Sequence, residues 1–184
     1  MLIEPLLEHL EHVGRKQIIT DRDDSDPYLE RWYVTFPDST QRERKDIPLN
    51  TFVHLFHKSD DPVFHSHPWE WFHSTIMRGG YWEHTPWGTK WYDEFSQRFV
   101  DCKALRHLDD DPSRPLVPAN MHWVELKYPG ETYTLFSRGP TKDNGFWGFM
   151  PDLETGEIIY HETYLKQHRK WNRTNGTTQS TGMG

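Results

Sequence analysis

The sequence predicts an all-β protein with a single domain, either a sandwich or a closed barrel. Short runs of β-forming residues recur along the chain at regular spacing and are separated by turn residues. Hydrophobic residues make up only 34% of the 184 residues, whereas aromatic residues reach 15% and include nine Trp. A core built largely from aromatic rings suits the interior of a β-barrel better than a helix bundle. A chain of this length lies in the usual range for one domain.

Glycine and proline turns separate the expected strands. A hairpin is expected at Gly79 and Gly80, where the backbone must tolerate positive φ, and another at Pro129 and Gly130. The expected strands cover Lys16–Thr20, Arg31–Phe36, Phe52–His57, Phe64–His67, Phe72–Met77, Tyr81–Thr85, Met121–Lys127, Tyr133–Arg138, Phe146–Met150 and Ile158–Tyr160.

The two ends of the chain differ from this strand-rich middle. Apolar residues recur at helical spacing near the start, and Gly14 stands where a helix would end, so a short amphipathic helix is expected over residues 4–13. Residues 172–184 are almost entirely polar, a composition that buries too little apolar surface to become ordered by itself. We therefore expect one domain over residues 1–171 and a disordered tail over residues 172–184.

Composition also limits the partners and the compartment. The formal net charge of −7, with acidic residues spread along the chain, argues against a surface that binds nucleic acid. No apolar stretch approaches the roughly 20 residues that a membrane span needs. Cys102 is the only cysteine, and the chain begins without a secretory signal pattern. We expect a cytoplasmic protein with no membrane partner.

Histidines gather in one part of the chain. Six of the twelve lie between His54 and His84, and His65 and His67 are two residues apart in one expected strand. Residues two apart in a strand project from the same face, so both imidazoles can bind one divalent ion. The alternative is a structural role for the pair, which is common for histidines in strands.

The residues after this pair offer a third ligand. Pro68 ends the strand or forces a bulge, because proline cannot donate a hydrogen bond to a ladder. The chain can then re-enter the barrel with Glu70 or His73 directed inward. Nucleophilic hydrolysis receives no support, since Cys102 lies in a polar stretch and no Gly-x-Ser-x-Gly elbow is present.

His65-x-His67, followed by the Gly-Gly turn, resembles the first motif of the cupin superfamily. The run Pro118–His122 resembles the second motif, in which a later strand supplies another histidine. The resemblance implies a cupin-type double-stranded β-helix (jelly-roll) barrel. It also implies a divalent metal ion, Fe, Mn, Ni or Zn, bound by His65, His67 and His122.

The resemblance leaves the remaining ligand open. The family usually places a glutamate four or five residues after its second histidine, where this chain has Trp71 and Phe72. His73 matches the family's spacing from glutamate to glycine and is one candidate. Glu70 is a second candidate, and Glu83 on the next strand is a third.

Several segments resemble small uncharacterised cupin-like proteins of bacteriophages and bacteria. They cover roughly residues 50–150 and include His54–Asp60, His65–Trp69, Arg78–His84 and Thr134–Pro140. For a phage-encoded chain, this resemblance implies a location in the host cytoplasm or the virion. It says little about substrate, because function lies in the site rather than in the fold.

Other residues are candidates for contact with the metal ligands or with a substrate. His54 either orients a metal-bound imidazole or is a surface histidine. Arg138 ends a strand where a barrel mouth would lie, and it either clamps a carboxylate or phosphate or forms a salt bridge. Trp69 and Trp82 either line a pocket that stacks on a planar or sugar-like ligand or pack in the core.

Two classes of function fit these observations. In the first, the protein is a metal-dependent enzyme of oxygenase or isomerase type that acts on a small molecule. In the second, the barrel is a non-catalytic ligand-binding module or a phage structural or host-interaction module. An open site with a roomy pocket favours the enzyme, and a closed site favours the structural role. A homo-oligomer is compatible with both.

Overall fold

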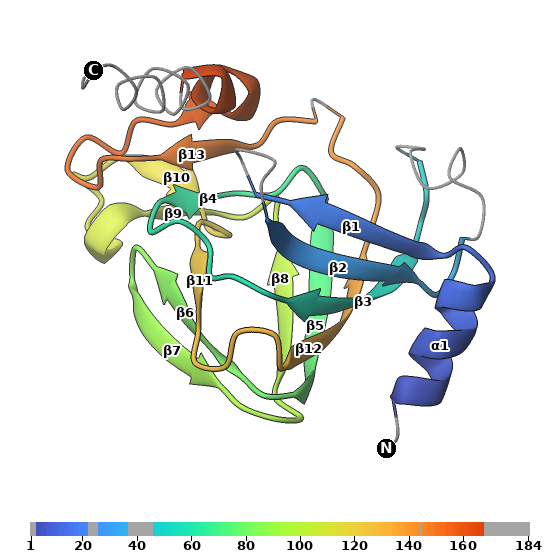
Figure 1. The fold of residues 1–184 in the computed structure, drawn as a ribbon. Helices are drawn as coiled ribbons and strands as arrows, with labels where there is room; N and C mark the ends of the chain where they lie inside the picture. The colour runs from blue at the N-terminus through green and yellow to red at the C-terminus, as the bar shows by residue number, and fades with distance from the viewer. Residues whose placement is uncertain (1–2, 22–25, 37–45, 144, 168–184) are drawn as a thin grey trace, which may run out of the picture.

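The computed structural model describes residues 3–21, 26–36, 46–143 and 145–167 of the chain (Figure 1). The predicted tail over residues 172–184 lies outside the described residues. The elements are α1 (Glu4–His12), β1 (Lys16–Thr20), β2 (Pro27–Tyr33), β3 (Asn50–Phe56), β4 (Phe64–His65), β5 (Trp71–Arg78), β6 (Tyr81–Thr85), β7 (Gly88–Tyr92), β8 (Gln97–Asp101), β9 (Leu105–His107), η1 (Leu108–Asp110), β10 (Leu116–Pro118), β11 (Trp123–Leu126), β12 (Thr132–Arg138), β13 (Gly148–Met150) and β14 (Ile159–Tyr160), followed by a helix over residues 161–167.

Antiparallel sheets build the protein. The largest has six strands in the order β1-β2-β3-β12-β5-β8. The three-stranded sheets β11-β6-β7 and β14-β13-β4 are linked to each other by an antiparallel bridge between His65 and His122. Ile76 of the large sheet packs against Tyr81 and Val124, so the sheet β11-β6-β7 faces it across a shared core. The predicted all-β class with an N-terminal helix is confirmed.

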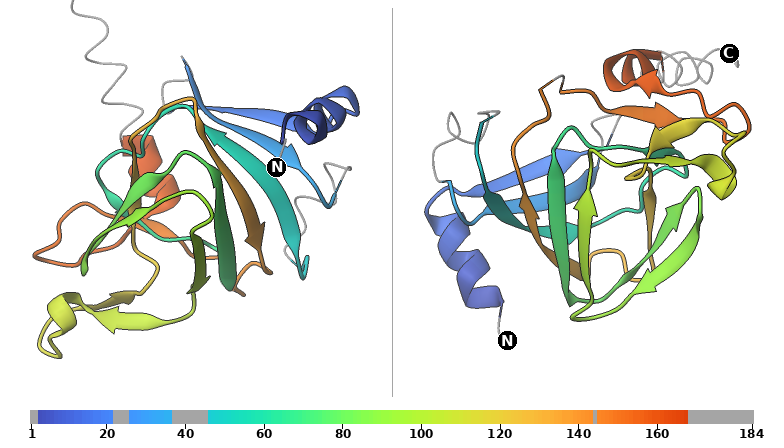
Figure 2. Two further views of the ribbon diagram at one scale, coloured as in Figure 1. Left: turned by 90° about the horizontal axis from the view of Figure 1, so that it is seen from below. Right: turned by 180° about the vertical axis from the view of Figure 1, so that it is seen from behind.

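Helix α1 lies against the outer face of the six-stranded sheet, away from the smaller sheets (Figure 2). Its buried Leu7 and Leu10 pack with Trp32 of β2 and with Val53 and Leu55 of β3. Side chains alternate between the two faces of a strand, so the residues between Val53 and Leu55 and on either side of them face the barrel interior. No helix among the described residues is long and apolar enough to cross a membrane.

Aromatic rings fill this interior, as the composition predicts. Phe136 of β12 stacks on Phe52 of β3 and on Phe72 of β5, with ring centroids 5.3 and 5.2 Å apart. Phe52 and Phe72 are almost completely buried. Offset stacking of this kind adds stability beyond the burial of apolar area.

Strands β1 and β6 have the predicted bounds, but β7, β8, β9 and β10 were not expected. These strands lack a clear apolar alternation. For example, β8 reads Gln-Arg-Phe-Val-Asp, and its Phe99 is 65% exposed. Strand β8 is an edge strand that pairs with β5, and β9 pairs with β10. Tertiary pairing, rather than local composition, accounts for such strands.

The packing of α1 on the sheet yields a stability prediction. Replacing Leu10, which is 3% exposed, by Ala should lower the free energy of unfolding by about 2–5 kcal/mol, because it leaves a cavity under the helix. Leu6 on the same helix is 42% exposed, and Leu6→Ala should cost no more than about 0.5 kcal/mol. Urea unfolding of the two variants measures the difference. Equal losses would show that α1 does not dock through Leu10.

Candidate metal centre

Backbone pairing brings His65 and His122 together. The N–H of each residue donates to the carbonyl of the other, with N···O distances of 2.9 and 3.0 Å. Directly opposite residues in such a pair have their side chains on the same face of the sheet. The two imidazole rings consequently lie side by side, with centroids 5.0 Å apart.

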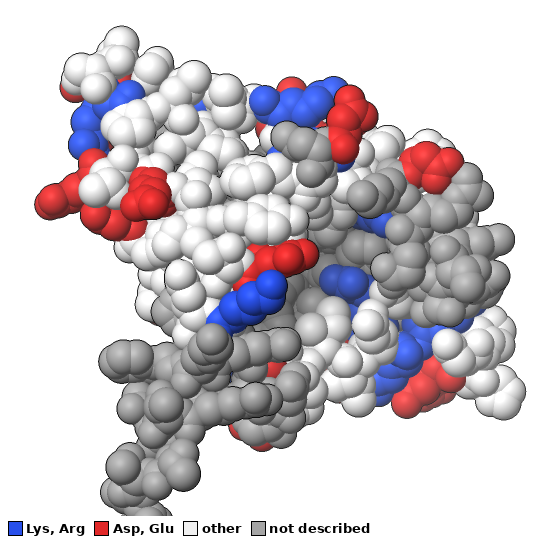
Figure 3. All heavy atoms as spheres, turned by 90° about the horizontal axis from the view of Figure 1, so that it is seen from above, with Lys and Arg blue, Asp and Glu red and all other residues white. Residues whose placement is uncertain are grey.

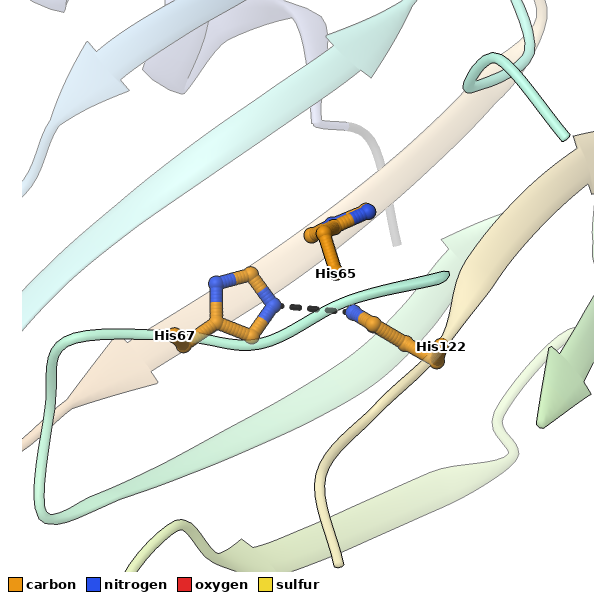
Figure 4. Close-up of side chains that lie close together, drawn as sticks. All are labelled: His65, His67 and His122. Carbon is orange, nitrogen blue, oxygen red and sulfur yellow. Dashed lines mark hydrogen bonds between the residues drawn. The ribbon is translucent and has the colours of Figure 1, made fainter. Parts of the chain in front are cut away.

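His67 completes the group, as Figure 4 shows. Strand β4 ends at His65, yet the chain stays extended enough for Ser66 to face the other way, where its Oγ accepts from the N–H of Gly148 at 3.1 Å. His67 then returns to the side of His65, with its ring 5.3 Å from that of His65. Its Nε2 lies 2.8 Å from Nε2 of His122. The convergence of the three histidines that the sequence predicts is present.

The donor set suits a transition-metal ion. The contact between the two Nε2 atoms is close to the roughly 2.9 Å that separates adjacent ligands of an octahedral ion at metal–nitrogen bonds of about 2.0–2.1 Å. The ligand atoms of all three histidines lie within 4.8 Å of one another.

Burial keeps two of these imidazoles neutral. Removal from water holds the pKa values of His67 and His122 well below the ordinary 6.5, and the positive charge of Arg98 adds to the effect. A neutral imidazole has the free lone pair that a metal ion requires. Both ligands are therefore in the protonation state for metal binding at neutral pH.

Glu83 of β6 orients His122 by contacting Nδ1, the ring nitrogen that is not directed at His67. The Nδ1–H of His122 donates to Oε1 of Glu83, which leaves Nε2 unprotonated and directed at His67. Arg98 of β8 forms an ion pair with the same oxygen at 2.6 Å. Burial raises the pKa of Glu83, while Arg98 and a hydrogen bond from Tyr92 oppose the rise. The prediction of Glu83 as a metal ligand is corrected: its carboxylate contacts the far nitrogen of His122.

The other predicted ligands, Glu70 and His73, lie away from the three histidines. Phe72 contacts the rings of His67 and His122, and the next residue of β5, His73, points to the opposite face. Oε2 of Glu70 lies 3.4 Å from Nζ of Lys103, on the wall of a separate cavity of about 400 Å³. The group of closely spaced ligand atoms contains neither residue.

The two predicted tryptophans have different positions. Trp69 stacks on His67, with centroids 4.9 Å apart and planes within 8°, so it forms a wall of the site. Trp82 alternates with the buried Glu83 on β6 and is 42% exposed beside Trp91. The prediction that Trp82 binds a substrate at this site is wrong, because strand alternation places it outside the barrel.

His54 and Arg138 both face the barrel interior. The ring of Phe136 lies 5.4 Å from that of His54, between it and the wall formed by Trp69. His54 instead accepts a hydrogen bond from Arg31 at 3.0 Å, so it does not orient a histidine of the triad as predicted. Arg138 is buried and donates to the carbonyl of Gly139 at 3.1 Å.

Sequence reasoning missed Arg98 and Tyr92, which hold Glu83 in place. Both residues lie on strands that were not expected, β8 and β7. Within β8, the only local sign that Arg98 faces inward is that Arg98 and Val100 alternate with the exposed Phe99. This alternation does not indicate which carboxylate pairs with Arg98. The register of β5 and β8, which sets Arg98 opposite Ser74, supplies that information.

Fold and site together define a β-barrel protein with a three-histidine centre. Neither the family models nor the curated proteins contain a match to this chain. Among solved structures, the chain is similar to an RmlC-like cupin from Ralstonia eutropha JMP134, with 11% identity, a TM-score of 0.41 and coverage of 98% of this chain and 97% of that one.

Two further structures are similar at the same level. An RmlC-like cupin from Shewanella frigidimarina NCIMB 400 shares 15% identity, with a TM-score of 0.41 and coverage of 70% of this chain and 88% of that one. KdgF from Halomonas sp. shares 12% identity, with a TM-score of 0.42 and coverage of 72% and 92%. Similarity at this level carries no argument about activity.

The buried histidines predict how stability depends on pH. Burial holds the pKa values of His54, His67 and His122 below the value of about 6.5 that applies in the unfolded chain. Below that pH the unfolded state binds protons that the folded state does not. The free energy of unfolding of the metal-free protein should therefore fall on acidification from about pH 7.5 to 5.5, by up to about 1.4 kcal/mol per pH unit for each histidine.

Urea unfolding with a chelator at the two pH values measures this slope. The variant His54→Phe should show a smaller slope than the wild type, because it lacks one of the three groups. A wild-type protein that gains stability on acidification would contradict the assignment of neutral buried histidines.

Proposed function

We propose that this protein is a metal-binding β-barrel of the cupin type that holds one divalent transition-metal ion through His65, His67 and His122. Fe, Mn, Ni and Zn all accept imidazole ligands, so the donor set does not select among them. The observation that carries the proposal is the geometry at His122: its Nδ1 contacts the carboxylate of Glu83, and its Nε2 lies 2.8 Å from Nε2 of His67. A carboxylate behind a ligating histidine is the usual arrangement at protein metal sites.

We further propose that the site acts on a small molecule, with chemistry of the oxygenase or isomerase type. Three protein ligands leave positions of an ion free for substrate, and a bound ion would act there as a Lewis acid or as a redox centre. The chain's own residues orient and shield this position. Glu83 and Arg98 fix His122, while Trp69 and Phe72 cover two of the imidazoles with apolar rings.

Metal content tests the proposal. After reconstitution with Fe(II), Mn(II), Ni(II) or Zn(II) in turn, the wild type should retain about one ion per chain, because three imidazoles converge on one point. His65→Ala, His67→Ala and His122→Ala should each lose most of it, as measured by elemental analysis. His73→Ala is the matched control on the opposite face of β5 and should bind as the wild type does. A wild type that retains no metal would remove the metalloprotein interpretation and leave a metal-free binding barrel.

The role of Glu83 can be tested separately. Glu83→Gln should weaken metal binding by about 10- to 100-fold, because the amide holds the His122 tautomer less firmly than the carboxylate does. Glu125 forms a similar contact with His84, 2.9 Å long, on the protein surface. Glu125→Gln is therefore a matched control and should leave affinity unchanged in a competition titration with a chromophoric chelator. Equal affinities for the two variants would show that Glu83 does not support the site.

A further inference from the structure

Arg31 of β2 is a cation on the interior side of the large sheet. Its guanidinium carbon lies 4.6 Å from the centroid of Phe52, and its Nε donates to Nε2 of His54 at 3.0 Å. Among the described residues, no carboxylate lies within ion-pair distance of Arg31. In contrast, Arg98, a cation on the interior side of the same sheet near its other edge, is paired with Glu83. A half-buried guanidinium without a counter-charge is an unusual feature, because charges withdrawn from water are normally paired.

The contact with His54 leaves one edge of the guanidinium for an anion. Because Nε is engaged, the two terminal nitrogens of Arg31 remain as a fork, and neither has a hydrogen-bond partner in the described part of the chain. Two parallel N–H groups match the two oxygens of a carboxylate. Stacking on Phe52 and the bond to His54 hold the fork in one orientation.

Two buried polar atoms nearby also lack partners. Burial and the charge of Arg31 hold the pKa of His54 well below its ordinary value, so its Nε2 accepts from Arg31 and its Nδ1 carries the hydrogen. Nδ1 of His54 and Oγ1 of Thr134 are both buried, and the described residues give neither a hydrogen-bond partner. His54 and Thr134 lie directly opposite each other on β3 and β12. Buried polar groups are normally satisfied by protein, water or ligand, which points to a bound species here.

Aromatic rings connect this region with the three histidines. Phe136 contacts His54 and also Trp69, with centroid distances of 5.4 Å in both cases. Trp69 in turn stacks on His67. In Figure 3, the face seen from above is hollowed near its centre, and both basic and acidic side chains lie at the edge of the hollow. A planar apolar body fits against such a wall of rings.

We propose that Arg31, oriented by His54, is an anion subsite that holds the carboxylate of a small planar substrate whose other end faces the histidine triad. The substrate class is therefore an aromatic or unsaturated carboxylate. The subsite itself stands on Arg31, His54 and Thr134 alone. Its connection to catalysis rests on the proposed function of the metal centre.

Binding of benzoate and of the uncharged benzamide tests the subsite. Calorimetric titration of the metal-reconstituted wild type should show benzoate binding at least tenfold more tightly than benzamide. Arg31→Gln should lose this preference, because its side chain offers no charged fork. Arg78 lies at the end of β5, contacts Glu4 and is half exposed, so Arg78→Gln is a matched control that should keep the preference. Arg31→Gln should retain the wild-type metal content.

A second variant keeps the test decisive if Arg31→Gln fails to fold. Arg31→Lys keeps the charge but cannot present two parallel N–H groups, so it should bind benzoate several-fold more weakly than the wild type. Equal binding of benzoate and benzamide to the wild type, or benzoate binding by Arg31→Lys that equals the wild type, would overturn the subsite. If the wild type holds no metal but keeps an Arg31-dependent preference for benzoate, the metal proposal fails and the subsite stands.

Discussion

The reciprocal pairing of the backbones of His65 and His122 is the interaction on which the rest of this structure depends. It links the sheet that contains β4 to the sheet that contains β11, and so forms one continuous wall opposite the six-stranded sheet. The same two hydrogen bonds set two imidazoles next to each other. The same pairing therefore both closes the wall and places two side chains of the site together, since the side chains of an opposite pair share a face.

Charge is distributed unevenly inside the barrel. On the side of the triad, Glu83 and Arg98 form a buried ion pair, whose desolvation cost is offset by the hydrogen bond from His122 and by the contact of Arg98 with the ring of Phe72. On the side of β2, Arg31 has an aromatic and a histidine contact but no carboxylate among the described residues. The interior therefore combines a neutralised region around the candidate metal ligands with a positive region at the other end of a row of rings.

Because side chains alternate along a strand, some of the predicted site residues face the barrel interior and others face away from it. Phe72 and Glu83 face inward, so their neighbours His73 and Trp82 face outward. Residue type and proximity in sequence suggested Glu83, His73 and Trp82 as site residues. A single step along a strand reverses the direction of a side chain. Apolar residues occur on both faces of β5 and β6, so the sequence pattern does not show which face is the interior.

The sequence by itself determined the all-β class, the N-terminal helix and the convergence of His65 with His67, because these depend on local periodicity and on residues two apart. Motif resemblance added His122. Only the tertiary structure decided that Glu83 supports His122 rather than binding metal, and that His54 belongs with Arg31. These contacts join residues far apart in the chain, 39 positions for His122 and Glu83 and 23 for Arg31 and His54. Sheet register brings such residues together, and register follows from pairing across the whole barrel rather than from any local run of residues.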